Sequence, residues 1–223
     1  MRIIGIDPGL ASTGYGVIDN INDKLSLVEC GTIVTTPKDS VARRLQIIHA
    51  RLYEVAKRTQ PDVVSMEGLY FVQNITSGIA VAQGRGVAII GAIFGTMDTT
   101  GIEPAFAEYT PMQIKQAVVG YGKATKAQVT QMVRILLKIK DTDDKFSNHA
   151  ADALAAAICY AQSEKYCAAI EKAKAAAPPP NPIKPKKQIK KTSDNNTEEL
   201  SRIEQSKQLL TQMRTRTRRR KRR

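Results

Sequence analysis

The chain has 223 residues, enough for one globular domain of about 150–170 residues and an additional segment. Its net charge of +13 is unevenly distributed, because residues 1–172 hold 18 Lys and Arg against 17 Asp and Glu, whereas residues 173–223 hold 16 against 4. This distribution excludes a uniformly cationic domain, so any polyanion-binding site on the first 172 residues must be a local patch.

The three cysteines, Cys30, Cys159 and Cys167, have unrelated spacings, which argues against a disulfide framework and against a cysteine-rich metal site. Cys30 and Cys159 lie in apolar surroundings and are expected to be small core residues. The sequence begins with no secretory signal pattern. The longest apolar run, residues 87–94, is shorter than the about 20 residues that a bilayer requires. We therefore expect a soluble, cytoplasmic protein that has no membrane association.

Residues 3–19 predict a β-hairpin, because two short apolar runs are joined by a turn rich in Pro, Gly, Ser and Thr. Residues 24–34 predict a third, antiparallel strand. Asp7 ends the first run beside isoleucines that favour burial, and a lone buried carboxylate is costly. Asp7 therefore either caps the turn, since Asp before Pro-Gly is common in turns, or faces a cation.

Apolar positions recur at helical spacing over residues 41–55, after Asp39 or Ser40 as the N-cap. Residues 62–67 then predict a short strand. The order strand, helix, strand predicts a parallel crossover that places this strand beside the first one. Glu67 would then lie near Asp7 at one edge of the sheet, the alternative being a solvent-facing Glu at a strand end.

An apolar loop with two adjacent aromatic residues, Tyr70 and Phe71, follows Glu67 directly. This loop either packs into the core or stacks on, or wedges between, nucleic-acid bases. Residues 76–97 predict a helix rich in Gly and Ala, which indicates close backbone approach to the sheet or to the same helix of a second subunit. Arg85 within it is a candidate partner for a phosphate or a carboxylate, the alternative being a structural ion pair.

Residues 102–107 predict a fifth strand, after which Thr110 and Thr125 are expected to cap a short helix and a helix over residues 126–138. Lysines surround the glycine-rich loop between these two helices. Such lysines, together with helix N-terminal amides, can hold backbone phosphates, although lysine-bearing loops are also common on protein surfaces. The lysines concerned are Lys115, Lys123 and Lys126.

Residues 141–144 form an acidic stretch that we interpret as a solvated turn, and a strongly helical, alanine-rich sequence follows from residue 147. His149 and Asp152 are three residues apart on this helix and therefore share one face. The helix dipole explains a carboxylate in the first turn. It does not explain a His beside that carboxylate on a helix made of Ala, Leu and Ile. This helix is the third element with an unusually placed acid.

The composition changes at about residue 169, where Pro, Lys and small polar residues replace the apolar pattern. We predict a domain over residues 1–168 and a disordered, strongly basic tail over residues 169–223. The last ten residues are nearly all Arg and Lys. This arm either adds salt-sensitive affinity for nucleic acid without sequence preference or simply keeps the chain soluble.

Asp7, Glu67, His149 and Asp152 together predict a cluster of hard oxygen ligands with one imidazole. Such a cluster is unfavourable unless a cation neutralises it. Mg²⁺ prefers carboxylates and water, and imidazole ligation also suits Mn²⁺. Two such ions can activate water and stabilise the leaving oxygen in phosphodiester hydrolysis. The sequence contains no P-loop, nucleophile elbow or dinucleotide-binding fingerprint, so we predict metal-dependent cleavage of nucleic acid.

Six motifs in order over about residues 1–163 closely resemble those of the RuvC-type Holliday junction resolvases. They are Gly5-Ile6-Asp7-Pro8-Gly9, Thr13-Gly14-Tyr15-Gly16-Val17, Glu67, Gln83-Gly84-Arg85-Gly86-Val87-Ala88, Lys115-Gln116-Ala117-Val118-Val119-Gly120 and Ala150-Ala151-Asp152-Ala153-Leu154-Ala155. The resemblance implies an α/β, RNase H-like fold with a mixed five-stranded sheet flanked by helices. It also implies a homodimer that cuts two strands of like polarity in a four-way DNA junction during recombination and repair, with a branch-migration helicase complex as partner.

The resemblance also implies roles for individual residues. In that family, the acids matching Asp7, Glu67 and Asp152 bind the metal ions, and the aromatic loop matching Tyr70 and Phe71 lies at the junction centre. The lysines matching Lys115 and Lys126 contact or act near the scissile phosphate. His149 stands where many members carry a fourth acid, whereas some other members also carry a His there. This difference leaves the metal preference open. We therefore expect Mg²⁺, or Mn²⁺, with two ions in each site, and DNA contacts from Tyr70, Phe71, Arg85, Lys115, Lys123 and Lys126.

Two alternatives remain at this point. One, of a different class, is a non-catalytic junction- or DNA-binding protein with the same fold, and the other is an RNase H-like nuclease acting on another substrate, such as RNA–DNA hybrids. An actin-like ATPase or sugar kinase also carries an Asp and a Gly/Thr turn in its first hairpin. Those enzymes need a second glycine-rich phosphate loop and a much longer, two-lobed chain, and this sequence has neither.

Overall fold

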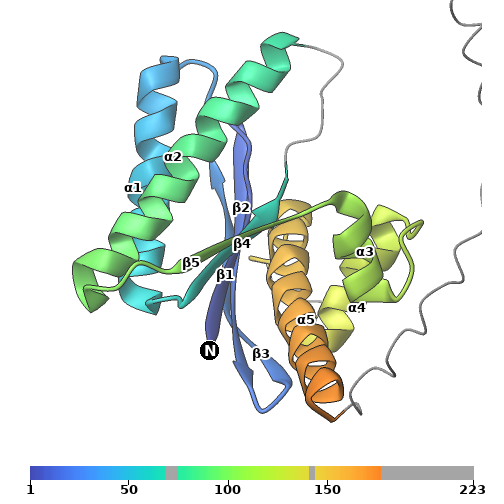
Figure 1. Ribbon diagram of the computed structural model, residues 1–223. Helices are drawn as coiled ribbons and strands as arrows, with labels where there is room; N and C mark the ends of the chain where they lie inside the picture. The colour runs from blue at the N-terminus through green and yellow to red at the C-terminus, as the bar shows by residue number, and fades with distance from the viewer. Residues whose placement is uncertain (69–74, 141–143, 177–223) are drawn as a thin grey trace, which may run out of the picture. The chain divides into compact units, whose positions relative to one another are not determined.

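The computed structural model describes residues 1–68, 75–140 and 144–176, and residues Met1–Ala177 form one compact unit (Figure 1). Its elements in chain order are β1 (Arg2–Asp7), β2 (Ser12–Ile21), β3 (Lys24–Val34), α1 (Val41–Thr59), β4 (Val63–Glu67), α2 (Ile75–Thr100), β5 (Ala105–Tyr109), α3 (Pro111–Val119), α4 (Lys126–Leu137) and α5 (Asn148–Ala176). Tyr70, Phe71 and the tail from residue 177 onward lie outside the described residues.

The five strands form one mixed sheet in the order β3-β2-β1-β4-β5. β1, β2 and β3 pair antiparallel, whereas β4 runs parallel to β1 and β5 runs parallel to β4. Ile6 pairs with Met66 across β1 and β4, so the next residues, Asp7 and Glu67, end neighbouring strands at the same edge. The mixed five-stranded sheet and the crossover predicted from the sequence are both confirmed.

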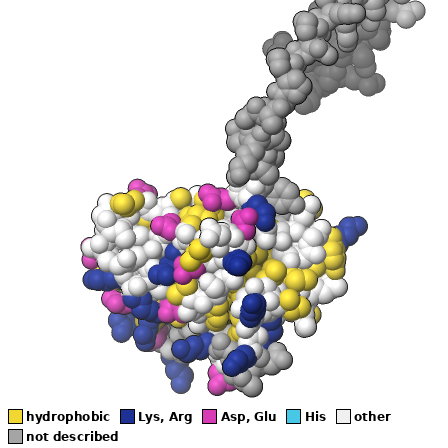
Figure 2. Space-filling view, turned by 90° about the horizontal axis from the view of Figure 1, so that it is seen from below, with side chains coloured by type: hydrophobic (Ala, Val, Ile, Leu, Met, Phe, Trp, Pro, Cys, Tyr) yellow, Lys and Arg dark blue, Asp and Glu magenta, His cyan; other side chains and the backbone are white. Residues whose placement is uncertain are grey.

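Helices cover both faces of the sheet, with α1 and α2 on one side and α3, α4 and α5 on the other (Figure 1). Because successive strand residues point to opposite faces, Ile3 belongs to the core under α5, and Ile4 to the core under α1 and α2. Both isoleucines are fully buried. On the face shown in Figure 2, Lys and Arg side chains are interspersed with Asp and Glu, in line with the nearly balanced charge of residues 1–172.

Two glycines allow α5 to lie directly on the strands. A Cβ atom on Gly5 of β1 would stand 1.9 Å from the carbonyl oxygen of Ala153, and one on Gly14 of β2 would stand 2.0 Å from that of His149. Any side chain at either position would push the helix away from the sheet. Gly14 is the strand partner of Asp7. The first turn of α5 is therefore held against the end of β1.

The local sequence signals are largely confirmed. Ser40, not Asp39, caps α1, and Thr110 and Thr125 cap α3 and α4 with full capping boxes. Cys30 and Cys159 are buried, as their apolar surroundings indicate.

Three boundaries differ from the sequence-based expectation. β5 begins at Ala105 rather than residue 102, because the chain joins the sheet only after Pro104, where the Ala105 amide donates to the carbonyl of Asp62. Glu108 consequently lies inside the strand. α2 extends to Thr100, and α5 continues to Ala176, past residue 168.

The length of α2 also changes one expectation. Its stretch Gly78–Thr100 is long and apolar enough to span a bilayer by length and composition, with a mean hydropathy of 1.5 over 18 of its residues. The expectation of too short an apolar run is therefore wrong for this helix, because small residues extend the apolar composition well beyond residues 87–94. One third of these 18 residues are buried inside the structure, where α2 packs on α1.

Candidate active site

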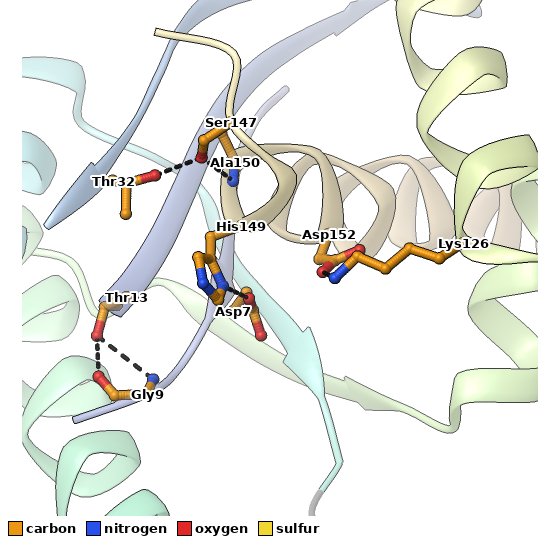
Figure 3. Close-up of polar contacts among 9 residues, drawn as sticks. All are labelled: Asp7, Gly9, Thr13, Thr32, Lys126, Ser147, His149, Ala150 and Asp152. Atoms are coloured by element: carbon orange, nitrogen blue, oxygen red, sulfur yellow. Dashed lines mark hydrogen bonds and ion pairs between the residues drawn. The ribbon is translucent and has the colours of Figure 1, made fainter. Parts of the chain in front are cut away.

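Four side chains singled out in the sequence meet at one end of the sheet. Asp7 ends β1 and Glu67 ends the neighbouring strand β4. His149 and Asp152 project from the first turns of α5, with His149 directed toward Asp7 (Figure 3). The four side chains belong to three segments far apart in the chain, and the close approach of α5 to the hairpin brings them together.

The side chains of Asp7 and His149 are in direct contact. Nδ1 of His149 lies 2.8 Å from Oδ2 of Asp7, within hydrogen-bond distance (Figure 3). The side chain of Asp7 is 27% exposed and that of His149 is 45% exposed, so the pair borders solvent. The carboxylate of Asp7 thus faces another side chain of the cluster, and Asp7 also ends the strand before the turn.

Lysines line the other side of the cluster. Nζ of Lys126, at the start of α4, donates to Oδ2 of Asp152 at 2.5 Å (Figure 3). Lys115 of α3 lines, together with Glu67, Asp152 and Lys126, a pocket of about 290 Å³. The structure thus places two of the three predicted lysines beside the carboxylates, where an incoming phosphate would meet ammonium groups and acids together.

The electrostatics of the cluster favour a neutralising cation. Burial raises the pKa of Asp7, and the hydrogen bond with His149 offsets part of this increase. Burial also raises the pKa of Glu67, with the charges of Asp7 and then Asp152 as further causes. The hydrogen bond to Asp152 raises the pKa of Lys126. The acids therefore repel each other, and Lys126 compensates part of their charge.

Replacing Glu67 with Gln is expected to stabilise the metal-free protein at neutral pH. Because the folded-state pKa of Glu67 is raised, its carboxyl favours the folded state only below its ordinary pKa, and this contribution is lost as the pH rises through the raised value. With solvent screening at this partly exposed site, we expect the melting temperature at pH 7 to rise by roughly 2 °C, and the difference to vanish near pH 4.

Thermal unfolding in the presence of a chelator measures this effect. Glu103→Gln, which changes an exposed acid in the loop before β5, is the matched control. An unchanged or lower melting temperature for Glu67→Gln at pH 7 would mean that the neighbouring lysines already compensate the charge of Glu67.

The chemical types of the donor groups, though not their present placement, suit a divalent metal ion. In residues 1–68, 75–140 and 144–176, no three His, Cys, Asp or Glu side chains converge closely enough to hold a metal ion as they are placed. Asp7 instead contacts His149, and Asp152 contacts Lys126. Carboxylates are the ligands that Mg²⁺ prefers, and the raised pKa of Asp7 and of Glu67 means that a cation would relieve unfavourable charge.

Two of the predicted DNA-contacting residues that the structure describes are placed away from these lysines. Lys123 is exposed in the turn between α3 and α4 and does not line the pocket. Arg85 is buried in α2, where its guanidinium donates to the carbonyl of Glu67 and pairs with Glu108. For Arg85, the structure thus shows the ion pair that the sequence offered as the alternative to a DNA contact.

Some residues that support the site were not anticipated from the sequence. The hydroxyl of Thr13 donates to the carbonyl of Gly9 at 2.6 Å and fixes the turn that follows Asp7 (Figure 3). The hydroxyl of Ser147 lies 2.5 Å from that of Thr32 and accepts from the amide of Ala150, which holds the start of α5 on the sheet. A Ser ahead of a helical run is a recognisable capping signal, whereas its strand partner could not be inferred.

Comparison with known proteins agrees with this arrangement. The family model described as crossover junction endodeoxyribonuclease RuvC matches residues 3–160. The chain belongs to this family. It is therefore an endodeoxyribonuclease, a phosphodiester hydrolase, of a family whose nuclease activity depends on metal ions.

Individual members are similar over nearly their whole length. The crossover junction endodeoxyribonuclease RuvC of Alkaliphilus metalliredigens is 42% identical over 163 residues, which cover 73% of this chain and 94% of the relative. The protein of the same name from Clostridioides difficile is 41% identical and covered to 92%. Among solved structures, T. thermophilus RuvC in complex with Holliday junction substrate matches with a TM-score of 0.66 and 32% identity, covering 75% of this chain and 96% of that one. The RNase H-like fold expected from the motifs is thereby confirmed.

Proposed function

We propose that this protein resolves four-way DNA junctions by metal-dependent hydrolysis of two strands of like polarity, in recombination and repair. The observation that carries the proposal is the grouping of Glu67, Asp152, Lys115 and Lys126 around one pocket, with Asp7 at the end of the strand beside Glu67, in a chain of this family. The similar T. thermophilus protein has been seen bound to a Holliday junction substrate, which supports junction DNA as the partner.

Asp7, Glu67 and Asp152 would hold the metal ions, with His149 as a further ligand or as the residue that orients Asp7. We propose Mg²⁺ as the metal, with Mn²⁺ as an alternative that the imidazole would accept, and two ions in each site. Bound metal ions supply activation of water and stabilisation of the leaving oxygen.

The lysines of this chain would bind the DNA backbone. Lys126 would exchange its contact with Asp152 for a phosphate oxygen when metal and DNA are present, and Lys115 would approach the same phosphate from the other wall of the pocket. Lys123, which is exposed in the turn that precedes α4, would contact a neighbouring phosphate. Tyr70 and Phe71, which follow Glu67 in the sequence, would stack on or wedge between bases at the junction centre.

An apolar stripe along α2 supports a homodimer. Three of its members are spaced by four and three residues, and the first lies about three helical turns before them, so all share one face of the helix. They are Ile79 (55% exposed), Ile90 (43%), Phe94 (52%) and Met97 (37%). A second copy packed on this stripe would bury it and would supply the second active site that cutting two strands requires.

Replacing Phe94 with Asp is expected to weaken this dimer, because a charge would enter the centre of the apolar stripe. The dissociation constant of the dimer should increase by at least about tenfold, since truncation of a central aromatic residue costs about 2 kcal/mol or more. Sedimentation analysis of the wild type and the variant measures this change. Ile135→Asp, which places the same charge on an exposed apolar position of α4, is the control. Equal dissociation constants for both variants and the wild type would remove α2 from the interface.

We further propose that the protein is cytoplasmic and that it acts together with a branch-migration helicase complex. Although α2 is long and apolar enough for a membrane, it carries the buried, charged Arg85, and a third of the stretch packs inside the domain. Its exposed stripe is better explained by a second copy of the chain than by lipid.

One comparison of substrates tests the proposed function. A mobile four-way junction, a plain duplex of the same sequence and an RNA–DNA hybrid are offered at equal salt with Mg²⁺ or Mn²⁺. We expect cleavage of the junction in two strands of like polarity. Equal cleavage of all three substrates would favour a nuclease of broader substrate range, and binding without any cleavage would favour a non-catalytic junction-binding protein.

A further inference from the structure

One buried turn of α2, residues 84–85, lies against both strand ends that carry predicted metal ligands. Gly84 packs on the turn after Asp7, since a Cβ atom on Gly84 would stand 3.4 Å from the amide nitrogen of Leu10. The next residue, Arg85, donates from Nη1 to the main-chain carbonyl of Glu67 at 2.7 Å. A single helical turn therefore contacts the main chain at Glu67 and in the turn that follows Asp7.

Arg85 is placed where packing alone would favour an apolar residue. Its side chain is only 8% exposed, and its other arm, Nη2, pairs with Oε1 of Glu108 on β5. Burial of a guanidinium is costly because the charge loses its hydration, and an apolar side chain of similar volume often fills such a position at no loss. The groups that the guanidinium holds therefore explain its presence better than packing does.

Two contacts hold the main chain directly after Glu67. The carbonyl of Glu67 accepts from Arg85, and the amide of the following residue, Gly68, donates to the carbonyl of Tyr109 at 2.9 Å. These contacts involve both ends of the peptide group that joins Glu67 to Gly68. Glu67 and Tyr109 are the last paired residues of β4 and β5, so this peptide lies where the strand pairing ends.

We propose that Arg85 is a positioning residue, which holds the Glu67 main chain against β5 so that the Glu67 carboxylate is directed toward the metal site that it shares with Asp7 and Asp152. The proposal rests on the proposed function in taking Glu67 as a metal ligand. Groups that orient a metal ligand without touching the metal typically contribute about 10- to 100-fold to metal affinity or activity. A purely structural ion pair would instead contribute to folding without a specific effect on metal binding.

Direct titration of Mn²⁺ into the full-length, DNA-free protein, followed by calorimetry, tests the proposal. Arg85→Met removes the guanidinium with both of its contacts and leaves a long, apolar side chain in its place. We expect this change to weaken Mn²⁺ binding about tenfold. Arg85→Lys should recover part of this loss, because an ammonium can donate to the Glu67 carbonyl but lacks the planar fork. Junction binding without metal should stay within about twofold of the wild type, since Arg85 is buried.

Thr96→Val is the matched control, because Thr96 is also buried on α2 and its hydroxyl donates only within the helix, to Ala92. Its Mn²⁺ affinity should equal that of the wild type. An Arg85→Met variant whose Mn²⁺ affinity matches that of Thr96→Val would overturn the proposal.

Glu108→Gln keeps the proposal testable if Arg85→Met fails to fold, because Glu108 is half-exposed and the change keeps its shape. We expect a smaller loss of Mn²⁺ affinity, about threefold, and no change would overturn the proposal. The proposed function is judged separately, by whether the wild type cuts junctions. A wild type that cuts, together with an Arg85→Met variant of normal Mn²⁺ affinity, would refute the positioning role alone.

Discussion

Replacing Asp7 with Asn is expected to abolish junction cleavage while leaving junction binding intact. The substitution keeps the shape of the side chain and its contact distance to His149 but removes the negative charge that a metal ligand requires. We expect the cleavage rate to fall at least about 10³-fold with either Mg²⁺ or Mn²⁺, as is usual when a residue that acts directly in the chemistry is lost. Metal-free binding to a four-way junction should be equal to that of the wild type or slightly tighter, since one charge that repels phosphate is gone.

Asp23→Asn provides the matched control. Asp23 lies in the β2–β3 turn, at the far end of β2 from the residue that pairs with Asp7. Its positive φ of 62° is one that Asn adopts readily, and the change costs only an exposed ion pair with Lys165. Single-turnover cleavage and gel-shift binding, measured for both variants, separate chemistry from affinity. An Asp7→Asn protein that keeps more than about a tenth of the wild-type rate would remove Asp7 from the metal site.

Truncation after Ala176 is expected to weaken the binding of junction DNA strongly and to flatten its dependence on salt. The residues removed contain most of the net positive charge of the chain, whereas the remaining domain is nearly neutral. Each phosphate contact that is lost lowers the slope of log affinity against log salt by about 0.9. If about five cations of the tail contact phosphates, the slope falls by about 4–5, and the affinity at 50 mM salt falls about a hundredfold or more.

Titration of junction binding between 50 and 200 mM salt measures the affinity and its salt slope. Cleavage by the truncated protein at low salt should persist, because the site lies within the compact unit Met1–Ala177. A full-length variant with Gln in place of the Arg and Lys residues of 214–223 separates charge from length. A salt slope unchanged by truncation would remove the tail from the DNA interface.

The sequence was most informative where one local rule determines the outcome. The caps Thr110 and Thr125 are read from a few adjacent residues, and α3 and α4 begin after them. The placement of Glu67 beside Asp7 required one further rule, that a strand–helix–strand unit makes a parallel crossover, and the pairing of Ile6 with Met66 confirms it.

Boundaries were less predictable because pairing between strands, rather than composition, decides them. The sequence predicted a strand from residue 102, yet β5 starts only at Ala105, where its partner strand β4 begins. In the same way, α5 continues beyond residue 168, since Ala and Lys favour a helix even where they offer little apolar surface for burial.

The sequence by itself determined the elements, the family motifs and the acids at strand ends, since these depend on local propensity, hydrophobic period and spacing. Only the tertiary structure decided which side chains meet. The contact of His149 with Asp7 joins residues 142 positions apart, and it exists because Gly14 lets α5 lie on β2. The sequence offered Arg85 either a phosphate or a carboxylate as partner, and only the packing of α2 against the ends of β4 and β5 showed which groups it contacts. Helical period specifies which face of α2 is buried, but the groups that this face meets come from distant strands, whose arrangement is set by the core as a whole.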